Sequence, residues 1–513
     1  ATLDSCDISY NEFGGLSELN NVSIQNSVIS YNTVLTRDGG SAGAGINGII
    51  NSTLTNVIIE YNKTIDGAGG GIIVGSATPN TTLENVTIRH NYAVYGGGIA
   101  QRGSGQFIEL STENKCNVYG NYATVGTDFH WENPEDGNVT IVLDTFTVAN
   151  STSFYAYTEN GGNITIQSSN NVVNAQVGDV YVDPSGSNNN SGNSVSSPFK
   201  NIYYAFLSIY ANSGLPGTIH LADGTYSPST NGEYFPLGGK DHVSIVGTSQ
   251  NETILNGDSL TSIFHYEDID NVTISDLTVT NGYSSNDGGG IYIERSDVEF
   301  DNISINNNTA LNRGAGISGD NANISLNNAD ISYNVTSGSG GGIFSDNSSY
   351  DLYDSSLDIE NSIIHHNVAG STAGGLYLYG SQVLDSQNPN YYNIKNTSFS
   401  YNGSSHSGSA IEFNHAKLTL DLCTFDSNYN HFNSNTISTL FNNNPHGLDV
   451  INCLFINNGS NNSDRTIYYD YNADITGQSQ LLINNSTIVN NYGGIYPVTG
   501  DYSVINSIIY NNE

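Results

Sequence analysis

The sequence has very little positive charge. Its 513 residues include 12 Lys and Arg against 49 Asp and Glu, which gives a formal net charge of −37 at pH 7. Without a basic patch, the chain has nothing to attract a nucleic acid or an anionic membrane. Charged residues make up only 12% of the chain, about half of the usual quarter, so the surface must be built from Asn, Ser, Thr, Gly and Tyr. No cofactor is expected, except that Ca²⁺ would suit so acidic a surface.

Long hydrophobic runs and methionine are also missing. No run of 18 apolar residues occurs, so the sequence predicts no transmembrane helix. No signal peptide opens the chain, which contains no Met, and Leu3, Cys6 and Ile8 already follow the repeat described next. We interpret the chain as a processed or excised product with its secretion signal removed. We therefore expect it outside the cell or at the cell surface.

The sequence does contain a repeat built on the pattern N-x-x-[I/F]-x-x-N. Neighbouring copies start 21 to 35 residues apart, and degenerate copies start at Ser5, Lys115 and Leu422. A repeat of this period is typical of the coils of a solenoid. The first residues of the complete copies, which we call the anchor asparagines, are Asn26, Asn56, Asn85, Asn302, Asn328, Asn361, Asn396, Asn452, Asn485 and Asn506.

Apolar residues alternate with polar ones on both sides of each anchor asparagine. Val298 and Phe300 precede Asn302, and Ile303 and Ile305 follow it, so the alternation predicts strands with one buried face and a break at the anchor. Asn tolerates the left-handed conformation that a bend there requires. Stacked coils would then align the anchors in a structural asparagine ladder. The anchors that lie in N-x-[S/T] sequons are expected to be buried: Asn85, Asn302, Asn396 and Asn485.

A glycine-rich segment recurs in phase with the anchors. It has the form GGGI or GAGI at Gly288–Ile291, Gly314–Ile317 and Gly340–Ile343, among others. Glycine there allows a positive φ or a close approach of backbones in neighbouring coils. A single GGG is a weak signal, but its recurrence in phase with the anchor pattern strongly indicates a solenoid.

These paired motifs resemble those of the polymorphic outer-membrane-protein family of β-helix adhesins. They are also similar to those of Asn-rich adhesin-like proteins of methanogenic archaea. The resemblance covers most of residues 1–130 and 270–513 and implies a right-handed parallel β-helix at a cell surface. It implies no catalytic residues.

The pattern changes in the middle of the chain. Residues 1–130 predict a first β-helix of about five coils, and 131–178, which open with Trp131, predict β-strands without anchors. We interpret 131–178 as the closing segment of the first β-helix, because solenoids need atypical terminal units. Residues 179–245 predict the N-terminal cap and first coils of a second β-helix, which continues over 246–513 with an open C-terminal end.

The order of elements after Asp179 resembles the start of pectin-lyase-like β-helix proteins. A short strand at Val180–Val182 precedes a polar loop, a segment S-P-F-x-x-I-x-x-A from Ser197, and the strand Gly217–Leu221. We expect a short helix with Ser197 as its N-cap and Pro198 as its first residue. The predicted fold class is therefore all-β, with two right-handed parallel β-helical regions of the pectin-lyase-like kind in tandem.

The four cysteines all follow an anchor position directly. Cys6, Cys116, Cys423 and Cys453 thus occupy an inward position of the coil, where we expect buried free thiols that act as small hydrophobes. Cys423 and Cys453 lie in adjacent coils, roughly 4.8 Å apart, so a disulfide between them is an alternative. Metal binding has little support, because no CxxC motif occurs.

Candidate catalytic residues are scarce, so we predict that the protein is not an enzyme. A glycoside hydrolase needs paired carboxylates on one face, and no Asp-Asp pair occurs. The densest charged patch runs from Glu294 to Asp301, where Glu294 and Arg295 are interpreted as outward strand residues. His90 and the pair His365-His366 are interpreted as turn residues. Carboxylates converging with Arg or Lys on one groove would favour a polysaccharide lyase or hydrolase instead.

Tyrosines also recur in phase with the repeat. Tyr31, Tyr61, Tyr333 and Tyr401 each stand just before the second Asn of a copy, which predicts a stripe of rings along one edge. The stripe can stabilise the coils by stacking, or it can bind glycans or other cells as in an adhesin. Sequons outside the anchor positions are candidate glycosylation sites: Asn21, Asn138, Asn251, Asn347 and Asn402.

Both ends of the chain lie within a repeat. Leu3 and Ile8 at one end and Val504 and Ile509 at the other are candidate assembly faces, because an open strand edge can pair with another chain. Stacking of the last coil of one copy on the first coil of another would build an open fibre. We therefore expect a non-enzymatic extracellular structural protein, a fibre or coat subunit that assembles head to tail. The alternative is a segment of a surface adhesin that binds glycans or cells.

Overall fold

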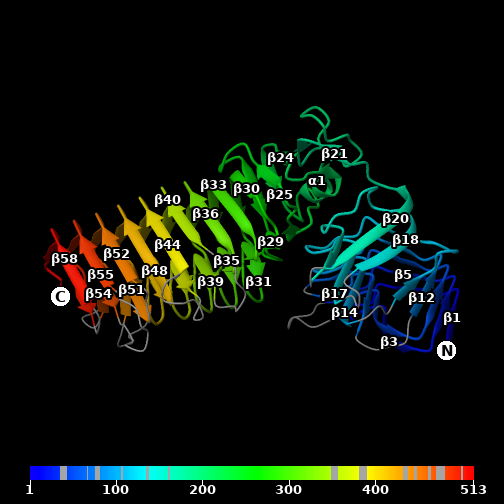
Figure 1. Ribbon diagram of the computed structural model, residues 1–513, viewed down its shortest axis with the longest axis horizontal. Coiled ribbons are helices and arrows are strands. Elements are labelled where there is room, and N and C mark those ends of the chain that lie inside the picture. Colours follow the sequence, from blue (N-terminus) through cyan, green and yellow to red (C-terminus); the bar gives the residue numbers. More distant parts are fainter. Residues whose placement is uncertain are drawn as a thin grey trace. The chain divides into compact units, whose positions relative to one another are not determined.

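The computed structural model describes residues 1–512 except 35–42, 66, 76–80, 105–107, 134–137, 160–161, 348–355, 381–389, 431–436, 444–446, 460–463, 470–479 and 498–500. The chain forms two compact units, Ala1–Gln176 and Val177–Glu513. Nearly all regular structure in both units is β-strand (Figure 1).

The first unit stacks its strands in three main sheets. The seven-stranded sheet contains β2 (Asp7–Ser9), β5 (Val28–Ser30), β9 (Ile58–Glu60), β13 (Thr87–Arg89), β16 (Cys116–Tyr119), β18 (Asn138–Phe146) and β20 (Asn163–Asn171). The five-stranded sheet contains β1 (Thr2–Asp4), β4 (Ser23–Gln25), β8 (Thr53–Thr55), β12 (Thr81–Glu84) and β15 (Ile108–Leu110). The six-stranded sheet contains β3 (Leu16–Asn20), β7 (Ile46–Ile50), β11 (Ile72–Val74), β14 (Ile99–Ser104), β17 (Phe129–Asn133) and β19 (Ala156–Thr158). In addition, β6 (Thr33–Val34) pairs with β10 (Lys63–Thr64).

The second unit contains a much longer stack. Its 21-stranded sheet contains β22 (Val180–Val182), β24 (Gly217–Leu221), β25 (Gly224–Tyr226), β27 (Val243–Val246), β28 (Thr253–Asn256), β30 (Val272–Thr280), β33 (Asp297–Asn306), β36 (Asn323–Asn327), β37 (Asp330–Ser332), β40 (Leu357–Glu360), β41 (Ile363–His365), β44 (Asn390–Lys395), β45 (Ser398–Ser400), β48 (Ala416–Asp421), β49 (Thr424–Asp426), β52 (Gly447–Ile451), β53 (Leu454–Ile456), β55 (Gln480–Asn484), β56 (Thr487–Val489), β58 (Asp501–Ile505) and β59 (Ile508–Tyr510).

Two further sheets complete the coils of the second unit. The ten-stranded sheet contains β26 (Leu237–Gly238), β29 (Phe264–Glu267), β32 (Ile291–Glu294), β35 (Ile317–Asp320), β39 (Ile343–Asp346), β43 (Leu376–Tyr379), β47 (Ile411–Asn414), β51 (Ile437–Asn443), β54 (Asp464–Tyr469) and β57 (Ile495–Pro497). The six-stranded sheet contains β31 (Tyr283–Ser284), β34 (Thr309–Ala310), β38 (Val335–Thr336), β42 (Val368–Ala369), β46 (Gly403–Ser404) and β50 (Tyr429–Asn430). The remaining elements are helix α1 (Ile202–Ser208) and the pair β21 (Gln176–Val177) and β23 (Ile209–Tyr210).

Equivalent residues of successive coils stack on one another in parallel register. Ile291 pairs with Ile317 and Ile317 with Ile343, and all three are fully buried in the bore. Burial of such a side chain contributes about 1.5–3 kcal/mol relative to its exposure, and every coil repeats that contribution. The expected fold class is confirmed: the chain is all-β and forms parallel β-helices.

The anchor asparagines take the predicted bend. All ten have a left-handed backbone, with φ between 47° and 55°. Their side chains form a ladder in places, since Asn56 donates to Asn26 at 3.1 Å and Asn85 donates to Asn56 at 2.8 Å. The ladder lies at the surface, however, and the prediction of burial is wrong for all four anchors concerned: Asn85, Asn396 and Asn485 are exposed, and Asn302 is partly exposed. A turn that points its side chain outward leaves the anchor amide in solvent.

The buried ladder is instead formed by the second Asn of each copy. In the second unit, the amide of Asn308 donates to Oδ1 of Asn334 at 3.0 Å, and that of Asn334 donates to Oδ1 of Asn367 at 3.0 Å. All three side chains are fully buried. The same contact continues through Asn402, Asn428, Asn458, Asn491 and Asn512. These bonds satisfy polar groups that would be costly to bury unpaired.

The glycine-rich segment is required by close packing between coils. Gly340 has φ of 72°, and a Cβ on Gly341 would lie 2.4 Å from the carbonyl oxygen of Gly374 in the next coil. Only small residues occur at the equivalent position of neighbouring coils, namely Gly289, Ala315 and Gly374, which explains why the motif recurs in phase with the anchors.

Helix α1 begins later than the sequence suggests. Its N-cap is Asn201, which makes no side-chain capping bond, so the prediction of Ser197 as N-cap and Pro198 as first residue is wrong. The carboxylate of Glu233 takes the capping role instead, because Oε2 accepts the N–H of Ile202 at 2.8 Å. Local sequence around Ser197 contains no sign of this distant cap.

The opposite end of α1 is held by a buried lysine. Nζ of Lys240 donates to the carbonyl oxygen of Phe206 at 3.1 Å and to that of Ile209 at 2.7 Å. Burial raises the pKa of Glu233 to about 7 and lowers the pKa of Lys240 to about 7. One short segment thus supplies groups to both ends of the helix.

The tyrosine stripe is a stack of rings. Ring centroids of Tyr31 and Tyr61 lie 5.0 Å apart, and those of Tyr61 and His90 lie 5.1 Å apart. In the second unit, His366 lies between Tyr333 at 4.7 Å and Tyr401 at 4.9 Å. The near-parallel rings cover one another's faces, so mainly edges and hydroxyls are left for solvent. This geometry favours coil stabilisation over stacking on a sugar.

The four cysteines are free thiols. Cys116, Cys423 and Cys453 are buried, and Cys6 is partly exposed. Sγ of Cys423 lies 3.3 Å from the carbonyl oxygen of Ile394, and Sγ of Cys453 lies 3.2 Å from that of Ile451. The interpretation as small buried hydrophobes is confirmed for these three, and the alternative of a disulfide between Cys423 and Cys453 is not.

Candidate functional site

The outward face of the ten-stranded sheet brings together carboxylates from four successive coils. Strands β29, β32, β35 and β39 each end in an acidic residue, and these residues pair in register. Each follows an inward-facing residue, so it points out of the bore. We call this row the acidic column: Glu267, Glu294, Asp320 and Asp346.

A second row lies two residues earlier on the same face. His265 of β29 pairs with Tyr292 of β32, and Phe344 of β39 pairs with Tyr377 of β43. The rings of Phe344 and Tyr377 stack with centroids 5.0 Å apart, while those of His265 and Tyr292 are tilted at 4.9 Å. We call these four residues the aromatic column, which Ser318 of β35 interrupts between Tyr292 and Phe344. The two columns run side by side because strand alternation places residues i and i+2 on one face.

Stacking forces the carboxylates of the acidic column close together. Parallel strands lie about 4.8 Å apart, so each carboxylate has acidic neighbours above or below it. Burial, together with the negative charges of Glu294 and Asp346, raises the pKa of Asp320 to about 6.

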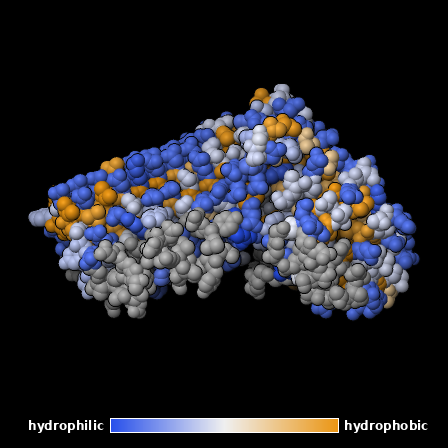
Figure 2. Space-filling view, viewed as in Figure 1, coloured by the Kyte–Doolittle hydropathy of each residue, from blue (hydrophilic) through white to orange (hydrophobic). Residues whose placement is uncertain are grey.

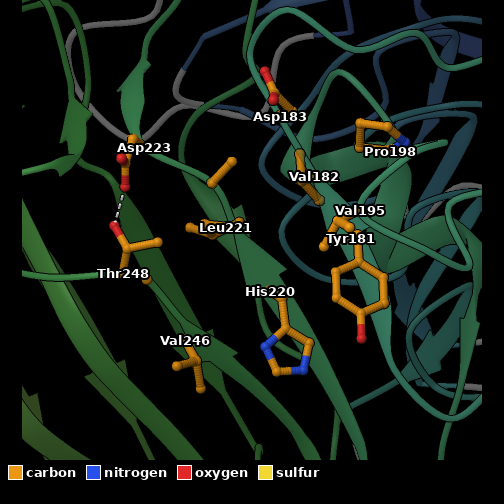
Figure 3. Close-up of a pocket in the computed structure, with 12 residues that line it drawn as sticks. Tyr181, Val182, Asp183, Val195, Pro198, His220, Leu221, Asp223, Val246 and Thr248 are labelled. Atoms are coloured by element: carbon orange, nitrogen blue, oxygen red, sulfur yellow. Dashed lines mark hydrogen bonds between the residues drawn. The ribbon is translucent and has the colours of Figure 1, made fainter.

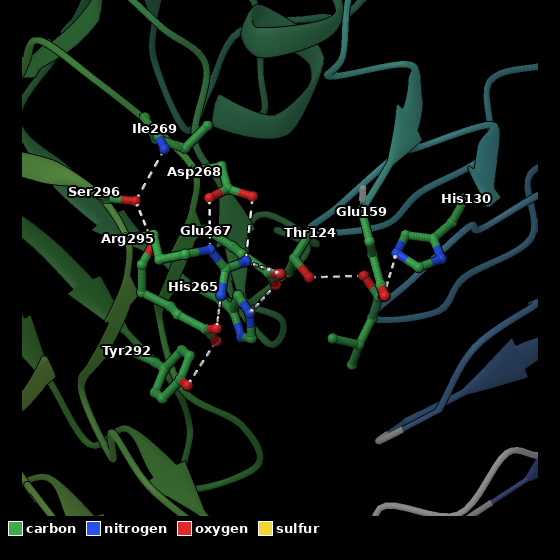
Figure 4. Close-up of polar contacts among 12 residues, drawn as sticks. Thr124, His130, Glu159, His265, Glu267, Asp268, Ile269, Tyr292, Arg295 and Ser296 are labelled. Atoms are coloured by element: carbon green, nitrogen blue, oxygen red, sulfur yellow. Dashed lines mark hydrogen bonds and ion pairs between the residues drawn. The ribbon is translucent and has the colours of Figure 1, made fainter. Parts of the chain in front are cut away.

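Arg295 binds three carboxylates at one end of the acidic column (Figure 4). It lies on the turn after β32 with a left-handed φ of 44°. Nε donates to Oδ1 of Asp268 at 2.7 Å, Nη2 donates to Oε1 of Glu267 at 2.9 Å, and Nη1 donates to Glu294. A single guanidinium thus holds three carboxylates, which leaves this end of the column negative.

Arg313 has the same role at the other end. Its Nη1 lies 3.4 Å from Oδ2 of Asp346 and its Nε lies 3.5 Å from Oδ1 of Asp287. Its guanidinium carbon lies 4.8 Å from the centre of the Phe344 ring, a cation–π contact. Burial raises the pKa of Asp287, although the charge of Arg313 opposes that shift. Arg313 therefore ties the acidic column to the aromatic column.

Hydrogen bonds also connect the two columns at β29 and β32. The hydroxyl of Tyr292 donates to Oε2 of Glu294 at 2.9 Å, and Nε2 of His265 lies 3.7 Å from Oε2 of Glu267. These contacts hold the side chains in fixed positions, as a preformed binding surface requires.

A smaller polar group lies on the six-stranded sheet of the first unit (Figure 4). Nε2 of His130 lies 3.4 Å from Oε1 of Glu159, and Arg102 lies 3.4 Å from Glu132. The ring of His130 stacks on Tyr157 at 5.6 Å. This group lacks a continuous column of acids, so it is the weaker candidate for a binding surface.

The acidic column and its surroundings suit a ligand that carries hydroxyl or amino groups. The four carboxylates of the column, together with those of Asp268 and Asp287, face only two guanidinium groups, those of Arg295 and Arg313. Carboxylates accept hydrogen bonds from sugar hydroxyls, and aromatic rings pack against apolar faces of a sugar. The excess negative charge disfavours an anionic ligand. Within the described part of the chain, no group of three or more His, Cys, Asp or Glu side chains is arranged to hold a metal ion.

The candidate glycosylation sites separate into two classes. Asn21, Asn138 and Asn251 are exposed. Asn402 is fully buried and donates to Asn428 at 3.0 Å, and Asn347 is buried and donates to the hydroxyl of Tyr392 at 2.7 Å. The prediction is wrong for Asn347 and Asn402, because an amide inside the coil cannot receive a glycan.

The candidate assembly faces lie in the first and last coils described. Leu3 and Ile8 are partly buried, whereas Val504 and Ile509 are exposed. Apolar atoms gather at the end of the second unit that contains β58 (Figures 1 and 2). Among the residues described, no helix has the length and apolar character to cross a membrane.

The acidic column was not predicted, although the sequence contains a signal for it. An acidic residue stands three positions after the Ile of the glycine motif in three coils: GGGIYIE ends at Glu294, GAGISGD at Asp320 and GGGIFSD at Asp346. The prediction that Glu294 and Arg295 point outward is correct for Glu294, but their convergence with Glu267 and Asp268 was missed.

Comparison with known proteins agrees with this fold. A family described as "Protein of unknown function (DUF1565)" matches residues 184–378, which include the acidic column. No curated protein matches the chain. Similar solved structures include pectate lyase Pel9A (14% identity, TM-score 0.38, 66% of this chain and 80% of that one) and mannuronan C-5 epimerase AlgE4 A-module of Azotobacter vinelandii (14%, 0.34, 58% and 87%). Pectin methylesterase PemA of Erwinia chrysanthemi is another (14%, 0.27, 62% and 81%).

The parallel register of its sheets makes the chain a parallel β-helix protein. At 14% identity and with TM-scores below 0.5, the three solved structures carry no argument about its chemistry.

Proposed function

We propose that this chain is a non-enzymatic extracellular β-helix protein that binds glycans on the outward face of its ten-stranded sheet. The observation that carries the proposal is the acidic column over four successive coils, with aromatic residues beside it in every coil but that of β35. A glycan chain laid along the coils would meet a carboxylate at each step of about 4.8 Å. The surface is rich in Asn and poor in Lys and Arg, and this composition and the resemblance to surface adhesins support an extracellular setting.

Charge favours neutral glycans and amino sugars over uronates. The face has more carboxylates than guanidinium groups, and the whole chain has a net charge of −37. An anionic polysaccharide would meet repulsion at short range and at long range.

The ion pairs favour binding over hydrolysis. A glycoside hydrolase needs one carboxyl group as acid and a second, free carboxylate as base or nucleophile. Asp320 has the raised pKa of an acid, but its neighbours are occupied: Glu294 by Arg295 and Tyr292, and Asp346 by Arg313. A carboxylate held by a guanidinium is a poor base, because the pairing lowers its proton affinity.

The test is a glycan array followed by calorimetry with a neutral β-glucan, a chitosan oligosaccharide and polygalacturonate. We expect the first two to bind and polygalacturonate not to bind. The double variant Glu294→Gln with Asp320→Asn should weaken binding about tenfold. Glu299→Gln changes an exposed acid in the neighbouring sheet and should leave binding unchanged. The proposal fails if none of the glycans binds, if the double variant binds like the parent, or if bound glycans are cleaved to new reducing ends.

A second candidate, head-to-tail fibre assembly, is favoured by one observation. Ile508, Ile509 and Tyr510 of the last coil are exposed, by 60%, 47% and 71%. A further coil would cover these side chains, and the first coil of a second copy, with Leu3 and Ile8, offers one. Electron microscopy should then reveal fibres that Ile509→Lys abolishes and that Val335→Lys, at an exposed mid-unit position, leaves intact. Isolated particles at high concentration would contradict fibre assembly without affecting glycan binding.

A further inference from the structure

A cavity of about 530 Å³ lies near the start of the second unit, apart from the acidic column (Figure 3). Strands β22, β24 and β27 pair in parallel there, with Tyr181 opposite His220 and His220 opposite Val246. The carboxyl ends of the three strands therefore meet at one place. Together with the segment that follows β22, they line the cavity.

The walls of the cavity are mostly apolar. Val182, Leu221 and Val246 come from the strands, and Val195 and Pro198 come from the loop that precedes α1. This combination of volume and lining is typical of sites for small organic ligands.

One end of the cavity is aromatic. The rings of Tyr181 and His220 stack with centroids 5.1 Å apart and planes inclined by 17°. Nε2 of His220 lies 3.2 Å from Oδ2 of Asp179, which fixes the imidazole in place. The stacked pair forms an aromatic wall at this end of the cavity.

Two carboxylates lie away from the ring pair, on the far side of the cavity (Figure 3). Oδ1 of Asp183 accepts the N–H and the hydroxyl of Ser185 at 2.7 and 2.6 Å, and Oδ1 of Asp223 accepts the hydroxyl of Thr248. Among the described residues, Oδ2 of neither aspartate has a hydrogen-bond donor. Lys and Arg are absent from the lining, so the two charges have no protein counter-ion in the cavity.

The loop that forms one wall is held rigidly. The N–H of Asp183 donates to the carbonyl oxygen of Phe199 at 2.9 Å, and the N–H of Tyr181 donates to that of Gly192 at 2.8 Å. The amide of Asn190 donates to the carbonyl oxygen of Pro198 at 2.8 Å. Binding would need little reordering of the loop, which lowers its entropic cost.

We propose that this cavity binds a small organic cation, an ammonium group on an apolar or aromatic body. The ammonium group donates to Oδ2 of Asp183 and of Asp223, and the body packs on Tyr181 and the apolar wall. An ammonium group has three donors and no acceptor, which matches two carboxylates whose second oxygens are available. The inference is independent of glycan binding by the acidic column.

The test is binding of benzylamine to the whole chain, measured by calorimetry or by ligand-observed nuclear magnetic resonance. Benzyl alcohol and benzoate have nearly the same shape without the positive charge. We expect benzylamine to bind about tenfold more tightly than benzyl alcohol, and benzoate not to bind. Asp183→Asn with Asp223→Asn should remove this preference, while Glu252→Gln, an exposed acid outside the cavity lining, should retain it.

Folding of the double variant is checked by far-ultraviolet circular dichroism. An asparagine retains an acceptor oxygen for Ser185 and for Thr248, so we expect the fold to be preserved. Should the double variant misfold, Tyr181→Leu provides a second measurement and should weaken benzylamine binding severalfold. Equal affinity for benzylamine and benzyl alcohol, or an undiminished preference in the folded double variant, overturns the proposal.

Discussion

The side-chain amide of Asn121 donates to Oδ1 of Asp128 at a distance of 2.9 Å. Asp128 is fully buried, and its other oxygen accepts the hydroxyl of Thr147 at 2.6 Å. Asn121 also accepts the amide of Asn91, so the buried ladder of the first unit ends on a carboxyl group.

The buried carboxyl group at the end of the ladder predicts that the stability of the first unit depends on pH. Burial raises the pKa of Asp128 from its ordinary 3.8 to about 7 in the folded protein. A raised pKa means that the folded state binds the proton more tightly than the unfolded state. The contribution of Asp128 to the free energy of unfolding is therefore fully present below about pH 4 and is lost as pH rises through 7. Asp128→Asn should therefore be more stable than the parent at pH 8, by up to about 4 kcal/mol, and similar to it at pH 4.

The measurement is urea unfolding followed by the fluorescence of Trp131. This residue is the only tryptophan and is buried in the first unit, so it reports on that unit and not on the titration of Glu233 or Lys240 in the second. A difference between variant and parent that does not change between pH 4 and pH 8 would contradict the role given to Asp128.

The two asparagine ladders should differ strongly in their contribution to stability. Asn367→Ala removes bonds to Asn402 and Ile331 and takes the Oδ1 acceptor away from the backbone N–H and the side-chain amide of Asn334. The side-chain amide of Asn334 retains its bond to Ile305, but its backbone N–H is left unpaired in the core. We expect a loss of about 3 kcal/mol or more in the free energy of unfolding. Asn361→Ala, in the exposed ladder, should cost only about 1 kcal/mol, mainly because Ala disfavours a positive φ. Denaturant unfolding compares the two, and equal losses would refute the distinction.

Glycan occupancy should follow burial. In a host that attaches N-linked glycans, we expect occupancy at Asn21, Asn138 or Asn251, whose side chains are exposed. Asn402 should remain unmodified, because its amide is inside the ladder. Peptide mapping by mass spectrometry measures each site. A glycan on Asn402 in folded protein would show that its coil is open.

Thiol reactivity should separate Cys6 from the other cysteines. Iodoacetamide reacts with accessible thiolates, and burial raises the pKa of Cys116 to about 11. We expect native protein to be alkylated at Cys6 only, and protein unfolded in urea to be alkylated at all four positions without prior reduction. Protection of Cys423 and Cys453 that persists in urea until a reductant is added would reveal a disulfide.

The sequence predicts the coil well because the coil is set by local chemistry. The odd step between Phe300 and Ile303 requires a bend at Asn302, and that residue has φ of 50°. The side of the turn on which an amide lies depends on the bend of the whole coil, so the sequence did not distinguish the partly exposed Asn302 from the buried Asn308.

Contacts between coils are harder to predict. Glu267 and Glu294 are 27 positions apart, and Glu294 and Asp320 are 26 apart, so whether they face one another depends on the length of each intervening loop. Likewise, the cap of α1 comes from Glu233, which follows Ile202 by 31 positions. The residue types of the candidate site can be read from the sequence, but which of them lie opposite one another in neighbouring coils cannot.

The direction of the asparagine ladders has an electrostatic consequence. In the buried ladder each amide donates toward the C-terminal coil, as Asn308 does to Asn334. Where the exposed ladder forms, its amides donate the opposite way, as Asn328 does to Asn302. Each row is a line of aligned amide dipoles, and the two lines point in opposite directions along the axis. Their fields oppose one another, so a β-helix can add coils without accumulating a dipole from its asparagines.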